Sequence, residues 1–161
     1  MVWEKLATTT LESDGDTVDT DTITVKTNNA FVSHDLQSGN IGGLNRINSD
    51  TGSNYASRFA IDGGSEWSLG TQPYWYSDFN PSNPYDIYGN GIIQNVANEE
   101  KLQCSFFVKQ IGTGSSQPPS YQKHVGKYVT SPESDMSSFQ MVNIESGDFV
   151  TDSNLTLFGT D

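Results

Sequence analysis

Four aspartates in one short segment are the residues of this sequence best placed to bind a metal ion. Asp14, Asp16, Asp19 and Asp21 follow Glu12 closely, and carboxylate oxygens are ligands that calcium prefers. Their spacing lacks the ligand register of an EF-hand loop, which also needs a glutamate at its twelfth position. Aspartate and glycine are also ordinary turn residues. We therefore expect an acidic turn and no cofactor, and these four aspartates are the candidates if calcium binds.

An aromatic segment between Pro73 and Tyr88 is the best candidate for binding. It combines tyrosine and tryptophan with asparagine and serine, the mixture of rigid rings and adaptable hydrogen-bonding groups that recognition loops use. Exposed rings could stack on a sugar or anchor a neighbouring protein. The alternative is that Trp75 and the alternating tyrosines face the core. The candidate residues are Tyr74, Trp75, Tyr76, Tyr85 and Tyr88.

Residue types that catalyse hydrolysis are present without a motif that joins them. His34 and His124 occur among many serines and aspartates, but a Ser-His-Asp triad has no support without geometry. The chain has no Gly-x-Ser-x-Gly nucleophile turn and no phosphate-binding Gly-x-x-x-x-Gly-Lys loop. Carboxylates for glycoside hydrolysis would be a spatial pair, which the sequence leaves open. We expect no enzymatic activity, and a small hydrolase ranks third among the hypotheses.

The two arginines of the chain flank a turn. Leu44–Ile47 and Tyr55–Phe59 alternate apolar and polar residues with the period of a half-buried strand. The residues between them are mostly asparagine, serine, aspartate and glycine, and Gly52 can adopt a positive φ at little cost. If the two arms pair as a hairpin, Arg46 and Arg58 lie near one patch of an otherwise acidic protein.

This turn resembles a segment of short virion proteins of tailed bacteriophages and related viruses. The shared pattern is Arg-x-Asn-x-Asp-[Ser/Thr]-Gly-Ser-Asn-Tyr-Ala-x-Arg, matched here by Arg46, Asn48, Asp50, Thr51, Gly52, Ser53, Asn54, Tyr55, Ala56 and Arg58. The resemblance extends to Trp3–Leu11 with Asp14–Thr17 after it, to Asn98–Leu102 and to the ending Leu155–Gly159. It covers most of the chain but not residues 74–91. It implies a β-sandwich domain of a virus particle.

The composition of the chain limits the kinds of partner it can bind. The 161 residues carry a net charge of −12 with a sequence pI near 4.2. This negative charge disfavours binding to the phosphate backbone of nucleic acids and to anionic membranes. The length suits one domain, residues 1–161. A hydrophobic content of 34% with 11% aromatics suits a thin, aromatic two-layer core and argues against global disorder. The start of the chain lacks the long apolar core of a signal peptide, so we expect no secretory leader.

The only cysteine, Cys104, lies in the apolar run Leu102–Val108. Free cysteine is among the most buried residue types, so we expect a small core residue and not a catalytic thiol.

Short apolar runs between turn residues predict strands, and no sustained helical period is present. The expected strands are Trp3–Leu11, Thr17–Lys26, Ala30–Gln37, Leu44–Ile47, Tyr55–Ile61, Tyr74–Phe79, Tyr85–Val96, Leu102–Ile111, Gln122–Val129, Ser138–Ile144 and Asn154–Phe158. Together they predict an all-β, antiparallel β-sandwich of jelly-roll type.

The predicted function is a non-enzymatic structural component of the virion, a capsid decoration protein or a tail module. Its partners would be other virion proteins and further copies of itself. The resemblance and the aromatic segment favour a homo-oligomer, with a trimer first. The alternative is a carbohydrate-binding module, lectin-like or receptor-binding, with a host surface glycan as ligand.

Overall fold

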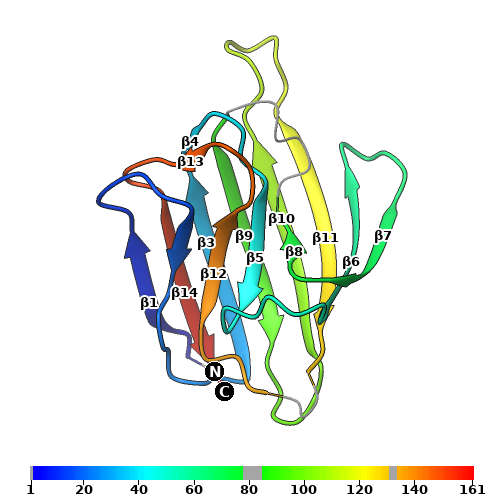
Figure 1. Cartoon of the computed structure of the whole chain (residues 1–161). Helices are drawn as coiled ribbons and strands as arrows, with labels where there is room; N and C mark the ends of the chain where they lie inside the picture. Colours follow the sequence, from blue (N-terminus) through cyan, green and yellow to red (C-terminus); the bar gives the residue numbers. More distant parts are fainter. Residues whose placement is uncertain (1, 78–84, 131–133) are drawn as a thin grey trace.

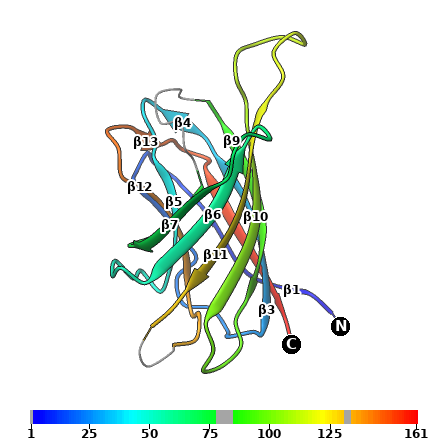
Figure 2. The same ribbon diagram turned by 90° about the vertical axis from the view of Figure 1, so that its right-hand side faces the viewer.

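The structure, a computed structural model, describes residues 2–77, 85–130 and 134–161. The described residues form strands and loops without a helix, and every strand pair is antiparallel. Two sheets pack face to face as a β-sandwich (Figures 1 and 2). The predicted all-β sandwich is therefore confirmed, whereas jelly-roll connectivity stays a prediction. No described segment is a helix with the length and apolarity that a membrane span requires.

The large sheet has eight strands. Their spatial order is β1 (Glu4–Thr10), β14 (Asn154–Thr160), β3 (Asn28–Asp35), β9 (Ile87–Gln94), β10 (Lys101–Lys109), β11 (Ser120–Tyr128), β6 (Tyr55–Ile61) and β7 (Trp67–Gln72). At its centre, Cys104 of β10 lies opposite Ile92 of β9 and Val125 of β11. Because side chains alternate along a strand, this register decides which residues share the outer face.

The small sheet has four strands. Their order is β2 (Thr17–Asp19), β12 (Phe139–Asn143), β5 (Gly43–Ile47) and β8 (Trp75–Tyr76). A separate pair joins β13 (Asp148–Phe149) to β4 (Gln37–Ser38). The expected strand Thr17–Lys26 is therefore much shorter, and β4, β7 and β13 were not expected.

The core lies between the two sheets and is aromatic. Phe31 of the large sheet packs against Phe139 of the small sheet, with ring centroids 4.9 Å apart, and against Phe107, at 6.2 Å. Trp75 and Met141 close the core from the small sheet and are fully buried. Each such side chain stabilises the fold by about 1.5–3 kcal/mol, which explains how a chain of modest hydrophobic content holds two layers together.

The turn between the arginines crosses from one sheet to the other. Its first arm is β5 of the small sheet and its second arm is β6 of the large sheet. The expected hairpin was therefore wrong, because each arm pairs with other strands. Positive φ falls on Asn48 and Ser49 and not on Gly52. Gly52 is needed for space, since a Cβ there would lie 2.7 Å from Asn54 Nδ2 and 3.0 Å from Asp50 Oδ1.

Candidate functional site

Strand β10, in the middle of the large sheet, has mostly polar side chains on its inner face, with Phe107 the apolar exception, and apolar side chains on its outer face. In β10, Gln103 and Ser105 face the interior, whereas Leu102, Cys104 and Phe106 face outward. Cys104 is therefore exposed, and its expected burial was wrong. Strand alternation, and not the apolar character of the run, decides its position.

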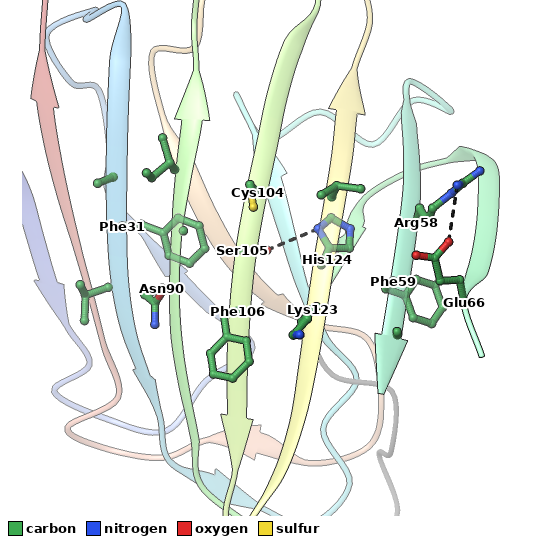
Figure 3. A pocket seen from close by; sticks show the side chains of 16 residues that line it. Phe31, Arg58, Phe59, Glu66, Asn90, Cys104, Ser105, Phe106, Lys123 and His124 are labelled. Atoms are coloured by element: carbon green, nitrogen blue, oxygen red, sulfur yellow. Dashed lines mark hydrogen bonds and ion pairs between the residues drawn. The ribbon is translucent and has the colours of Figure 1, made fainter. Parts of the chain in front are cut away.

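Apolar residues of four neighbouring strands meet on this outer face. We call Val32, Ile92, Leu102, Cys104 and Val125 the apolar patch. The four aliphatic members are each about half exposed, and cross-strand pairing places Cys104 between Ile92 and Val125. Figure 3 shows Cys104 and Phe106 at successive outward positions along β10. Exposed apolar residues gathered in this way make the outer face a candidate interaction surface.

A hollow of about 700 Å³ lies over the patch. Four members of the patch, Val32, Ile92, Cys104 and Val125, line it, and Phe106, Asn90 and Lys123 line it from β10, β9 and β11. Arg58 and Glu66 close the end nearest β7, joined by an ion pair of 3.5 Å (Figure 3). Both charged side chains are well exposed, so this pair contributes little to stability. The hollow is therefore an apolar floor with charge at one end.

The charge of this face differs from that of the whole chain. The outward positions of β14, β3, β9, β10, β11 and β6 carry Arg58, Lys123 and Lys127 and no carboxylate. Lys127 pairs with Glu100, beyond the start of β10, at 3.2 Å. A chain of net charge −12 thus has no acidic residue at the outward positions of these six strands, and Asp35 of β3 is buried on the inner face.

Beneath the patch lies a buried polar network centred on His124. Its Nε2 is 3.0 Å from Ser57 Oγ and its Nδ1 is 3.4 Å from Ser105 Oγ, which accepts a hydrogen bond of 2.9 Å from Gln103 Nε2. Burial lowers the pKa of His124 to about 4. The histidine is only 1% exposed and both serines are buried, although Ser105 and His124 are among the residues that line the hollow.

Trp75, the leading residue of the expected aromatic site, is a core residue with 0% exposure. Its Nε1 donates a hydrogen bond of 3.1 Å to the Lys127 carbonyl, and its ring meets Tyr55 edge-on at 5.4 Å. It therefore has no exposed ring with which to hold a sugar or a second subunit. Its burial agrees with the core-facing alternative.

The expected tyrosines do not form one site. Tyr74 and Tyr76 flank Trp75, are half-buried, and place their hydroxyls 3.2 Å apart. Burial, with the neighbouring Tyr74, raises the pKa of Tyr76 to about 12. Tyr85 is also half-buried, whereas Tyr88 stands exposed on the outer face of the large sheet. The Asn-Pro turns between them lie within 78–84, outside the described residues.

The two arginines are not brought together either. Arg46 lies on β5 of the small sheet, where its Nε donates to the Pro73 carbonyl at 3.3 Å. Arg58 lies on β6 of the large sheet and pairs with Glu66. Each arginine belongs to a different sheet, because the turn between them crosses the sandwich.

Three of the four aspartates of the acidic turn, Asp14, Asp16 and Asp19, accept hydrogen bonds through their carboxylates. Asp14 Oδ1 accepts from Thr151 N at 2.9 Å, and Asp19 Oδ1 accepts from Asp21 N at 3.0 Å. Asp16 Oδ1 accepts from the side chain of Asn143 at 3.3 Å. Across residues 2–77, 85–130 and 134–161, no three His, Cys, Asp or Glu side chains group as a metal site would require.

Comparison with known proteins assigns no family: no family model matches the chain, and no curated protein matches it. Among solved structures, an alginate lyase mutant bound to an alginate trisaccharide has a TM-score of 0.33 and 12% identity, covering 93% of this chain and 79% of its own. The receptor-binding domain of botulinum neurotoxin type G scores 0.26 with 5% identity, covering 99% and 43%. A mannose-binding lectin of Ralstonia solanacearum scores 0.13 with 7% identity, covering 77% and 96%. At these scores, none supports a ligand or an activity.

Proposed function

We propose that this chain is a non-enzymatic structural protein of a virus particle, a capsid decoration protein or tail module, that binds its neighbours through the outer face of the large sheet. The virion assignment rests on the resemblance of the segment Arg46–Arg58 and its companions to short virion proteins. The observation that carries the mode of action is the apolar patch, which is surface that a protein partner would cover.

The energetics favour a protein contact. Covering apolar surface stabilises a complex by about 25 cal/mol per Å² removed from water, and the patch presents four half-exposed aliphatic side chains together. The outward positions of the six strands carry no carboxylate, which lowers the electrostatic repulsion between copies of a chain of net charge −12. Apolar centre and charged margin are the usual arrangement of an interface.

One such neighbour is a second copy of the chain, and the resemblance favours a trimer. In a cyclic trimer each subunit offers one surface to a different surface of the next. The patch would supply one of these two surfaces. The alternative of a glycan site on Trp75 is weakened, because that ring is buried.

Two isoleucines provide the test. Ile92 in the patch is 57% exposed and Ile144, beyond β12 of the small sheet, is 48% exposed. In light scattering, we expect the unmodified protein to have a mass that is a multiple of 17.6 kDa. Ile92→Asp should lower that mass and Ile144→Asp should not. A monomeric unmodified protein would contradict the homo-oligomer, and unchanged assembly of Ile92→Asp would contradict the role of the patch.

A further inference from the structure

A row of aromatic side chains crosses the outer face of the large sheet beside the apolar patch. We call His34, Tyr88, Phe106 and Tyr121 the aromatic row. They come from β3, β9, β10 and β11, four strands that are adjacent in the sheet. Tyr88 is 58% exposed. The other three are partly exposed at outward positions.

The rings of the aromatic row pair across strands. His34 and Tyr88 face each other in the β3–β9 register and stack, with centroids 4.2 Å apart and planes 11° apart. Phe106 and Tyr121 stack with centroids 5.7 Å apart and planes 30° apart. Val108 lies opposite both Tyr88 and Tyr121 and therefore stands between the two ring pairs. Since neighbouring strands are about 4.8 Å apart, the row spans about 14 Å, a length suited to a chain ligand more than to a single small molecule.

Polar and cationic side chains lie beside the row. Asn90 and Lys123 are the residues opposite Phe106 on its two neighbouring strands. Lys123 Nζ is 5.7 Å from the centroid of the Tyr121 ring. Both side chains also line the hollow over the patch, with Arg58 further along it. A ligand on the row thus meets rings, an amide and positive charge together.

One carboxylate lies at the Tyr121 end of the row. Asp62, in the turn after β6, accepts hydrogen bonds from Tyr121 N at 2.8 Å and from Ser120 Oγ at 2.9 Å. Its oxygens are therefore used in holding the start of β11. This leaves Lys123 as the charged group that the outward strand positions place beside the row.

We propose that the aromatic row is a binding site for an acidic oligosaccharide. The apolar C–H face of a pyranose ring packs against the flat face of an aromatic side chain. Asn90 can hydrogen-bond hydroxyl groups, and Lys123 can pair with a carboxylate of the sugar. Charge complementarity selects an acidic over a neutral sugar, because these outward positions carry cations and no carboxylate although the chain is strongly acidic.

The test uses calorimetric titration of the full chain with pentagalacturonate, and with maltopentaose as the neutral sugar of equal length. We expect binding of pentagalacturonate that weakens as salt rises and little binding of maltopentaose. Tyr88→Ala and Lys123→Ala should each weaken binding at least tenfold. Tyr74→Ala and Lys5→Ala, a tyrosine near β8 and a lysine on the edge strand β1, should leave it unchanged, and circular dichroism checks that all four variants fold.

Three results would overturn the site. They are the absence of binding of pentagalacturonate, equal binding of the two sugars, and a change of assembled mass in Tyr88→Ala without a change in sugar binding. The last would mean that a second copy covers the row. The Ile92→Asp experiment does not depend on sugar, so failure here is separable from failure of the proposed virion contact.

Discussion

The hydroxyl of Tyr55 forms hydrogen bonds with both the backbone amide and the backbone carbonyl of Ile47. It accepts a hydrogen bond from Ile47 N at 3.0 Å and lies 3.1 Å from Ile47 O, to which it donates. Ile47 ends β5 in the small sheet and Tyr55 begins β6 in the large sheet. One side chain therefore fastens the two layers where the chain crosses between them.

Tyr55→Phe should destabilise the protein by about 1–3 kcal/mol, because it leaves the buried amide and carbonyl of Ile47 without this partner. Tyr88→Phe is the matched control, since Tyr88 is mostly exposed, and should cost little. Urea unfolding of both variants measures the difference. Equal stability of the two variants would show that the Tyr55 hydroxyl does not stabilise the connection between β5 and β6.

Gly52→Val should cost about 1–3 kcal/mol of stability. The new Cβ would displace the Asp50–Asn54 pair, in which Asn54 Nδ2 donates to Asp50 Oδ2 at 2.7 Å. Gly70→Val is the control, because a Cβ there meets nothing within 4 Å and the φ of Gly70 is not positive. Thermal unfolding compares the two, and a Gly52 variant as stable as the Gly70 variant would mean that the turn has room.

Acid should weaken the fold through His124. The pKa of this buried histidine is lowered to about 4 in the folded protein, whereas in the unfolded chain it lies near 6.5. Its contribution is thus complete above pH 6.5 and is lost as the pH falls from 6.5 towards 4, by up to about 1.4 kcal/mol per pH unit. His124→Gln should remove this part of the slope in denaturant titrations at several pH values. If the free energy of unfolding of His124→Gln falls with pH as steeply as that of the unmodified protein, His124 is not the source of the acid sensitivity.

The rate at which the Cys104 thiol is labelled should show whether a second copy of the chain covers the apolar patch. Because it is exposed, a thiol reagent should label it in dilute folded protein without denaturant. Labelling should slow as protein concentration rises into the range where copies assemble. A Cys104→Ser variant gives the background, and labelling that is independent of concentration would contradict burial of the patch between copies.

The sequence predicted most strands well. Tyr55–Ile61 matches β6 at both ends, and in the structure Tyr55, Ser57 and Phe59 are buried whereas Ala56 and Arg58 between them are not. β7 was missed because Trp67–Gln72 is an edge strand with little to bury and a central glycine. The crossing after Ile47 was also missed, because turn chemistry is alike whether a chain reverses within one sheet or passes to another.

The candidate surface was harder to predict than the fold. The run Leu102–Val108 is apolar enough to suggest burial on both faces, although polar Gln103 and Ser105 at alternate positions were the available signal that one face is unusual. Register across β3, β9, β10 and β11 brings the patch together, and register is a tertiary property. The residue type of Trp75 does not tell whether it is buried or exposed, because that depends on how the two sheets pack.

A density map of virus particles purified from the source of this chain tests the central claim most directly. It should show ordered copies on the capsid or tail, with the apolar patch of each copy covered by a neighbouring protein. Particles without the chain would contradict the virion assignment. Copies whose apolar patch faces open solvent would contradict the contact surface.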